Sequence, residues 1–120
     1  MVNYWIVGAN VDNQDMTDEF VKHGFWFADA LGAQQSIAQI QRGDRVAIKR
    51  MLGRGATEVA IKALGVVEKV ASYAALGFQM VYVTWIPLVD DRRAPFQGWG
   101  AAIHGPYSKA DQAIQNVFSL

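Results

Sequence analysis

Hydrophobic side chains fill both faces of the first segment of the chain, residues 2–9. On an extended backbone, Tyr4 and Ile6 lie on one face and Trp5 and Val7 lie on the other. A strand with two apolar faces is typical of the inside of a barrel or of a sheet covered by a helix. We therefore expect a short strand here that is buried on both sides.

Helical patterns occur in three places. The first helix is expected to begin at Thr17, an N-cap residue followed by two acidic residues, and to end at Gly24. A second, short helix is expected over residues 34–41. A third is expected to begin with the capping-box pattern that starts at Ser108. Its apolar stripe comprises Ala110, Ile114, Val117 and Phe118.

Extended segments are expected over residues 44–51, 57–70 and 78–86. Gly65 interrupts the second of them, which suggests a bulge or the corner of a barrel. Residues 89–105 carry a proline and three glycines and are expected to be irregular. Strands joined mostly by hairpins, with helices set apart from them, indicate an α+β fold. We expect a curved or closed sheet of about five to six strands with two to three flanking short helices.

The composition predicts one compact domain over residues 1–120, because 52% of the chain is hydrophobic and only 18% is charged. The formal net charge is zero, so no overall field draws nucleic acid to the protein. Any binding of nucleic acid must therefore depend on a local patch or a pocket.

Cysteine is absent, so the chain forms neither disulfides nor thiolate metal sites. No segment has the pattern of a signal peptide, and no apolar run is long enough to span a bilayer. These features predict a soluble, cytoplasmic protein without a membrane partner.

Residues suited to catalysis are few. His23 falls in the last turn of a predicted helix, where it complements the dipole, and His104 lies among glycines with no partner at a recognisable spacing. Motifs of metalloproteases, serine hydrolases and phosphate-binding loops are missing from the sequence. The acidic residues between Asp12 and Asp29 do not have the spacing of a calcium loop. We expect a protein that is not an enzyme and that uses no metal and no cofactor.

The segment Gly24-Phe25-Trp26-Phe27 places a large ring just after a helix-ending glycine. Flat rings in a rigid pocket are suited to hold a flat ligand such as a nucleobase. Trp26 is the main candidate, because its two phenylalanine neighbours can fill the core. Trp99, between two glycines, is a candidate for a pocket wall or a surface anchor, whereas Trp5 and Trp85 are expected mainly in the core.

Basic residues outnumber acidic ones across the expected hairpin of residues 42–62. Lys49, Arg50 and Arg54 are the candidates for contacts with nucleic-acid phosphates, which position a strand without reading its sequence. An ordinary solvated strand face would show the same excess of positive charge.

Five segments of the chain form a pattern by their order and spacing. They are Tyr4-Trp5-Ile6-Val7-Gly8-Ala9-Asn10, Gly24-Phe25-Trp26, Gly43-Asp44-Arg45-Val46-Ala47-Ile48, Ala63-Leu64-Gly65-Val66-Val67 and Val83-Thr84-Trp85-Ile86. Taken together, these segments resemble the EVE-like and YTH-like branches of the PUA-like superfamily, whose members bind modified nucleobases. The resemblance covers most of the chain and is greatest to the domains fused to AAA-type motors in modification-dependent restriction systems. It implies a PUA-like barrel that can be one domain of a longer protein, with a fused or associated motor or nuclease as partner.

The resemblance also implies roles for individual residues. Trp26 matches the tryptophan that forms one wall of the cage around a methylated base in YTH-like domains, and Asn10 and Asn13 match the polar residues that contact the base edge. Phe27 stands where those domains have a small hydroxyl residue, which argues against N6-methyladenine as the ligand. The candidates for the second wall are Trp99, Tyr73 and Trp85.

The function expected on these grounds is recognition of a methylated or hydroxymethylated base in DNA by a non-catalytic module. The alternatives are an RNA-binding accessory domain and a module that binds a small molecule or a protein. The residues expected to contact the base are Asn10, Asn13, Trp26, Phe27, Trp85 and Trp99.

Overall fold

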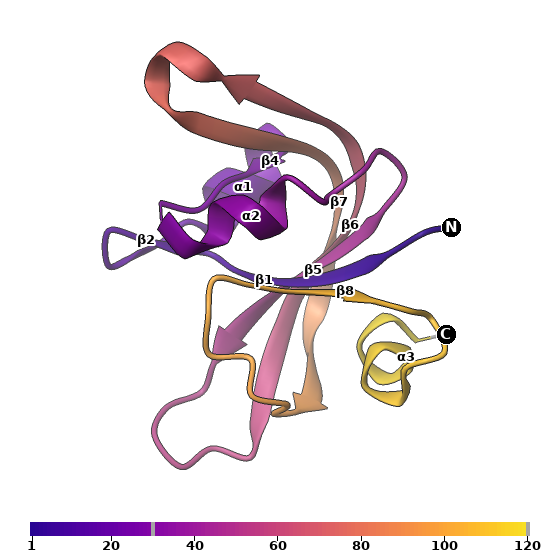
Figure 1. Cartoon of the computed structure of the whole chain (residues 1–120). Coiled ribbons are helices and arrows are strands. Elements are labelled where there is room, and N and C mark those ends of the chain that lie inside the picture. The colour runs from indigo at the N-terminus through magenta and orange to yellow at the C-terminus, as the bar shows by residue number, and fades with distance from the viewer. Residues whose placement is uncertain (30, 120) are drawn as a thin grey trace.

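The computed structural model describes residues 1–29 and 31–119. The opening hydrophobic segment forms strand β1 (Tyr4–Gly8), which lies inside the main sheet. Among the described residues the sheet has six strands in the order β4-β7-β6-β5-β1-β8 (Figure 1). β1 pairs with β5 in parallel, and the other four pairings are antiparallel. The other strands are β4 (Phe25–Trp26), β5 (Arg45–Met51), β6 (Glu58–Tyr73), β7 (Phe78–Pro95) and β8 (Ile103–Tyr107).

Helices cover both faces of this sheet, so the expected α+β class is confirmed. α1 (Thr17–His23) and α2 (Gln34–Ile37) pack on one face, and α3 (Gln112–Phe118) packs on the other (Figure 1). A small ribbon of β2 (Asn10–Val11) and β3 (Gln14–Asp15) extends from the end of β1. Two short turns of 3-10 helix complete the described elements, η1 (Leu31–Ala33) and η2 (Ala74–Leu76).

The expectation of a barrel is wrong, because the sheet is neither closed nor curled. β4 and β8 stand at its two edges and are not hydrogen-bonded to each other in the described part of the chain. Closure would require β8 to pair with β4, a strand of two residues. Because helices cover both faces, the sheet buries its apolar side chains without closing on itself.

Two hydrophobic cores lie on opposite faces of β1. Trp5 and Val7 enter the core beneath α1 and α2, whereas Tyr4 and Ile6 enter the core beneath α3. The expected burial of β1 on both faces is therefore confirmed. The α1–α2 core also includes Phe20, Trp26, Ile37, Val46, Ile48, Val67 and Val81, and the α3 core also includes Val59, Ile61, Trp99, Ile114 and Val117.

Asp44, directly before β5, fixes the start of the parallel pair. Its side chain is 2% exposed. Its carboxylate accepts hydrogen bonds from the backbone N–H of Asn3 (3.1 Å), the indole N–H of Trp5 (3.0 Å) and the backbone N–H of Gln41 (3.0 Å). Because β1 and β5 start together, the register places Gly8, the last residue of β1, opposite Lys49, and β5 continues to Met51.

The ends of the helices differ in part from the sequence expectation. Gly24 ends α1 in the left-handed conformation, with a φ of 75°, as expected. Thr17 does not cap α1 with its side chain but donates its N–H and its hydroxyl to Asp15 (2.9 and 2.6 Å). Asp111, rather than Ser108, caps α3, because its carboxylate accepts hydrogen bonds from two backbone N–H groups of the first turn. α2 is shorter than the segment expected to form it.

β7 continues past Pro87, where the sequence indicated its end, and β8 begins within the segment expected to be irregular. Pro87 pairs with Ala63 and Arg92 pairs with Ile61, so residues 88–91 bulge outward opposite a single residue of β6. A proline interrupts a ladder because it lacks an N–H group. The bulge allows the ladder to resume beyond it, which no local pattern signals.

Gly65 lies within an uninterrupted register on both sides of β6, so the expected bulge is wrong. A Cβ atom at this position would lie 2.4 Å from Cγ1 of Val83 and 2.7 Å from Cε3 of Trp85. The glycine is therefore required by the close packing of two side chains of β7 across β6.

Replacing Gly65 with alanine should lower the free energy of unfolding by about 1–3 kcal/mol, because the added methyl group overpacks this contact. Chemical denaturation measures the change. Gly32→Ala is the matched control, since a Cβ there meets nothing within 4 Å, and it should change stability by less than about 0.5 kcal/mol. Equal stability of the two variants would contradict the packing role of Gly65.

Candidate functional site

A cavity of about 510 Å³ opens where the ends of β1 and β5 meet; we call it the Gly8–Lys49 cavity. Three segments of the chain form its walls: the end of β1 with the β2–β3 ribbon, the end of β5, and residues 100–102 before β8. Figure 1 shows these segments on the same side of the molecule. The side chains discussed below that line it are Asn10, Asn13, Asp15, Thr17, Asp29, Lys49, Arg50 and Met51.

The β2–β3 ribbon forms the first wall because its turn suits the residues that occupy it. Asp12 and Asn13 both have positive φ angles, 51° and 63°. A two-residue hairpin turn of this kind needs left-handed residues at both positions, and aspartate and asparagine tolerate that conformation. Asn10 pairs with Asp15 across the ribbon. The turn therefore brings the amides of Asn10 and Asn13 to one side of the cavity.

Lys49 forms the opposite wall and is unusual among the charged residues. It is 6% exposed, and its Nζ lies 3.4 Å from the point where a Cβ on Gly8 would stand. Within residues 1–29 and 31–119, its ammonium group has no hydrogen-bond or ion-pair partner. Burial lowers the pKa of Lys49 below its ordinary value. A largely enclosed side chain thus presents its amine to the cavity.

The charges at the mouth of the cavity are, by contrast, matched. Burial alone would raise the pKa of the Asp15 carboxyl, but the hydrogen bonds from Thr17 and the positive charges of Arg50 and Lys62 outweigh it and lower the pKa. The carboxylate of Asp15 is therefore ionised at neutral pH and lies near the guanidinium group of Arg50. Arg50 is exposed, and so its charge is accessible to a ligand at the rim.

Residues 100–102 close the cavity from the side of β8. The carbonyl of Ala102 accepts a hydrogen bond from the N–H of Gly8 (2.9 Å), and Nε2 of His104 accepts one from the N–H of Ala101 (3.0 Å). Burial and the nearby charge of Lys49 lower the pKa of His104. The imidazole is therefore neutral at neutral pH, which suits its role as acceptor for Ala101.

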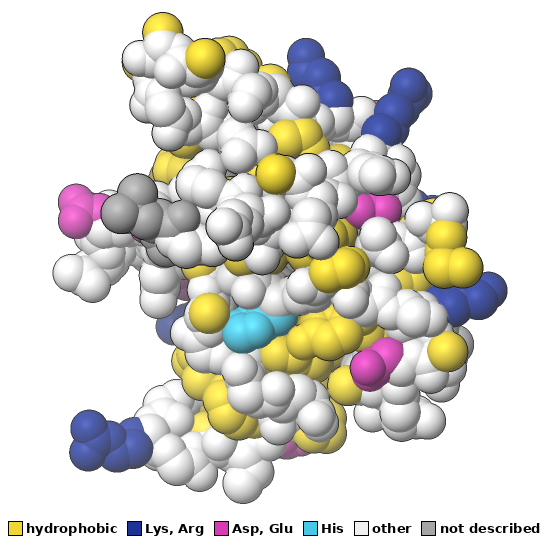
Figure 2. Space-filling model, in the orientation of Figure 1, with side chains coloured by type: hydrophobic (Ala, Val, Ile, Leu, Met, Phe, Trp, Pro, Cys, Tyr) yellow, Lys and Arg dark blue, Asp and Glu magenta, His cyan; other side chains and the backbone are white. Residues whose placement is uncertain are grey.

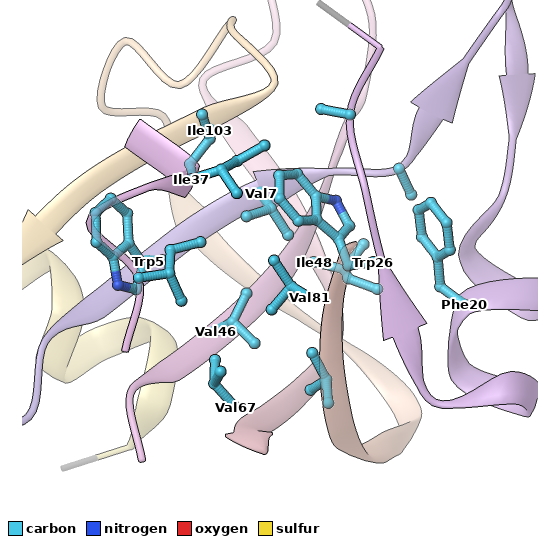
Figure 3. Packing of buried hydrophobic residues seen from close by; sticks show 14 of the residues in the cluster. Trp5, Val7, Phe20, Trp26, Ile37, Val46, Ile48, Val67, Val81 and Ile103 are labelled. Atoms are coloured by element: carbon cyan, nitrogen blue, oxygen red, sulfur yellow. The ribbon is translucent and has the colours of Figure 1, made fainter. Parts of the chain in front are cut away.

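Trp26 does not face the cavity, and the expectation of an open indole is wrong. The residue is 1% exposed and lies in the α1–α2 core, where Figure 3 shows its ring among Val7, Ile37 and Val81. The reason is the pairing of β4 with β7, which places Trp26 opposite the buried Val81. Its indole N–H donates to the carbonyl of Gly8 (2.8 Å). Trp26 therefore supports the cavity from beneath and offers no ring face to a ligand.

The other aromatic candidates also lie outside the residues that line the cavity. Trp99 is 1% exposed in the α3 core and donates to the hydroxyl of Tyr107 (3.2 Å), so a role as pocket wall or surface anchor is wrong. Trp85 and Phe27 are half-buried beside the α1–α2 core. Tyr73 lies at the far end of β6, hydrogen-bonded to the hydroxyl of Tyr82 (2.6 Å).

The structure therefore brings together part of the predicted site. Asn10, Asn13, Lys49 and Arg50 line one cavity, whereas Arg54 lies in the exposed loop after β5 and does not line it. Gly8, Asp15 and the small residues 100–102 were not identified from the sequence as part of a site. Gly8 carried no local signal, since its importance comes from the segments that pack around it.

No protein-family model matches this chain, and no curated protein matches it. Among the described residues, no group of three or more His, Cys, Asp or Glu side chains is placed to hold a metal ion. None of the helices in residues 1–29 and 31–119 is long and apolar enough to cross a membrane. The chemistry of the Gly8–Lys49 cavity is therefore the basis for a proposed function.

Replacing Trp26 with phenylalanine should destabilise the fold by on the order of 2 kcal/mol, because the change leaves the carbonyl of Gly8 unpaired next to the core. Thermal or chemical denaturation measures the loss. Trp85→Phe is the matched control, since its longer bond to Phe25 (3.3 Å) is made by a half-buried ring, and it should cost less. A Trp26→Phe protein as stable as the wild type would remove this hydrogen bond from the account of the site.

Lowering the pH through the ordinary pKa of histidine should reduce the free energy of unfolding. The pKa of His104 is lower in the folded protein than in the unfolded chain, so the unfolded chain binds the proton more readily. A fall in pH therefore favours the unfolded chain over the folded protein. Denaturation curves between about pH 7.5 and pH 5.5 measure the effect. This pH range lies above the one in which carboxyl groups titrate. His104→Gln keeps an acceptor for Ala101 and should weaken the pH dependence; an unaltered dependence would contradict this assignment.

Proposed function

We propose that this chain is a non-catalytic module that takes a nucleobase of DNA into the Gly8–Lys49 cavity. The observation that carries the proposal is that two amides, Asn10 and Asn13, share one cavity with the amine of Lys49 and an exposed guanidinium group. The resemblance to EVE-like and YTH-like domains favours a methylated or hydroxymethylated base as the ligand. A fused or associated motor or nuclease would then act on the DNA that the module recognises.

The dimensions and the polar groups of the cavity suit a base. Its volume of about 510 Å³ lies within the range of about 300–1,000 Å³ that is usual for small-ligand sites. Each amide side chain offers a donor and an acceptor side by side, the arrangement that pairs with the edge of a base. Met51 and the alanines at 101 and 102 supply apolar surface against which a methyl group can pack.

The charges indicate how a strand would be held. Lys and Arg side chains are scattered at the margins of the face shown in Figure 2 and do not form a continuous patch there. With a formal net charge of zero, long-range attraction to DNA is weak. Arg50 at the rim is therefore the group best placed to contact the phosphate beside an inserted base. A base must leave the duplex stack, or belong to a single strand, to enter the cavity.

Selectivity for a modified base would come mainly from rejection of the plain one. Burying a methyl group contributes only about 0.8 kcal/mol. A plain exocyclic amine that enters an apolar part of the cavity leaves a donor unpaired, which costs about 1–3 kcal/mol. Together these effects amount to roughly 2–4 kcal/mol, or about 30- to 1,000-fold in affinity.

The proposal is tested with oligonucleotides that carry plain, methylated or hydroxymethylated bases, as DNA and as RNA of the same sequence. Asn10→Ala and Asn13→Ala should each weaken binding to the preferred base by about 1–3 kcal/mol, because each removes contacts to the base edge. Fluorescence anisotropy measures the affinity. Loss of binding equal for all bases would contradict a role in reading the base, and stronger binding to RNA would favour the RNA-binding alternative.

Arg50→Ala should weaken binding to every oligonucleotide and flatten the dependence of affinity on salt, because one phosphate contact is lost. Arg42→Ala is the matched control, since Arg42 is also exposed but does not line the cavity. It should leave the salt dependence as it is in the wild type. If both variants behave alike, the phosphate path does not run past the cavity.

A further inference from the structure

Lys49 has a property that phosphate binding does not use. The Lys49 residue is 6% exposed, its amine opens onto a cavity large enough for a base, and the amine has no hydrogen-bond or ion-pair partner in the described part of the chain. A lysine that only contacts phosphates stands in solvent, where it keeps its proton and its hydration. A partly desolvated lysine amine that opens onto a ligand cavity is instead suited to act as a nucleophile.

We propose that the amine of Lys49 captures an aldehyde on the bound nucleotide as a reversible imine. This inference rests on the proposed function, since the aldehyde reaches the amine only on a nucleotide held in the Gly8–Lys49 cavity. It extends the ligands of that cavity from methylated and hydroxymethylated bases to nucleotides that carry an aldehyde. Two nucleotides carry that group: a formyl-pyrimidine, and an abasic site whose sugar is in the open-chain form. Both present the same aldehyde carbon to the amine, and the experiment below tells them apart.

The reaction is balanced without an oxidant, a reductant or a metal. The lone pair of the unprotonated Nζ attacks the carbonyl carbon, and the carbonyl oxygen takes up a proton to give a carbinolamine. The C–O bond then breaks, water leaves with the oxygen, and the nitrogen loses its second proton as the C=N bond forms. The products are one imine and one water molecule, and addition of water reverses the reaction.

The surroundings of Lys49 favour imine formation at this residue over imine formation at the other lysines. Gly8 has no side chain, so the space above Nζ is open to the ligand; a Cβ there would stand only 3.4 Å away. Arg50, Asp15 and Asp29 line the same cavity, and His104 is near enough for the charge of Lys49 to act on it. None of these side chains is hydrogen-bonded or ion-paired to the amine. Burial lowers the pKa of Lys49, which raises the fraction of unprotonated amine. Lys22, Lys69 and Lys109 are exposed and hydrated.

The test incubates the full chain with three oligonucleotides, which carry a formyl-pyrimidine, an abasic site or neither, and adds cyanoborohydride to reduce any imine to a stable amine. Peptide mass spectrometry should place the adduct on Lys49 for one or both aldehydes and show none for the plain strand. Lys49→Arg keeps the positive charge but cannot form the imine, and should lower the adduct yield at least tenfold. Lys109→Arg is the matched control at an exposed lysine and should leave the yield unchanged.

A second variant shows whether a lost adduct results from the missing amine or from misfolding. Lys49→Met keeps the length of the buried stem without an amine, and circular dichroism shows whether it folds; a folded Lys49→Met protein without adduct supports the inference. Adducts spread evenly over the exposed lysines would overturn it. Binding of the oligonucleotides with no adduct at Lys49 would overturn the inference and leave the proposed function in place.

Glyoxylate, a small aldehyde, tests aldehyde capture by Lys49 independently of oligonucleotide binding. An adduct of glyoxylate on Lys49, with no binding of any oligonucleotide, would support capture of aldehydes and overturn the proposed function. The absence of an adduct with glyoxylate and with both modified strands would overturn the inference alone, because oligonucleotide affinity is measured independently of the adduct.

Discussion

The hydrogen bond from the indole of Trp26 to the carbonyl of Gly8 holds the site to the core. A buried indole N–H needs an acceptor, and the end of β1 supplies one at 2.8 Å. The N–H of the same glycine donates to Ala102, and its side-chain face is open toward the amine of Lys49. Gly8 is therefore the point where the core, the segment before β8 and the end of β5 meet. The cavity depends on this one residue having no side chain and no free backbone group.

Two charged residues of one segment show the difference between structure and function. Asp44 stands directly before β5 and Lys49 lies within it, and the side chains of both are largely enclosed. Three donors satisfy the carboxylate of Asp44, so its burial fixes the parallel pairing of β1 and β5. Lys49 has no such partner among the described residues, and its amine opens onto the cavity instead. The contacts of this amine are therefore best explained by what enters the cavity.

The sequence predicted the elements whose signals are local. The two-faced hydrophobic pattern of β1 and the stop at Gly24 depend on neighbouring residues, and both are found in the structure. The orientation of Trp26 was not predictable in this way. In a strand of two residues, the side of the sheet that a ring occupies is decided by the register with β7, which lies far along the chain. Its acceptor, Gly8, is 18 residues away and has no feature that marks it.

The candidate site could likewise be predicted only in part from local sequence patterns. Lys49 and Arg50 were identified from the local charge pattern, and Asn10 and Asn13 from the resemblance to YTH-like domains. Their meeting in one cavity depends on the parallel register of Gly8 with Lys49. The full length of β7 was missed because its ladder with β6 resumes beyond Pro87 after a bulge. β8 was missed because it is formed by pairing with β1, at the other end of the chain. Sequence patterns report which residues face inward, whereas the closure or opening of a sheet is decided by which edge strands can pair.

The burial of Trp26 changes how a ligand could be discriminated. An aromatic cage stacks on any base, so it contributes affinity without much preference, and modification is then sensed by fit. Without the indole at the wall, preference must come from polar groups whose partners are either matched or left unpaired. Those groups are the amides of the β2–β3 ribbon, held by the left-handed turn at Asp12 and Asn13, and the amine of Lys49. The free-energy cost of an unpaired buried polar group is larger than the difference in stacking energy between bases. A cavity of this kind can therefore be more selective than an aromatic cage while it binds its ligand less tightly.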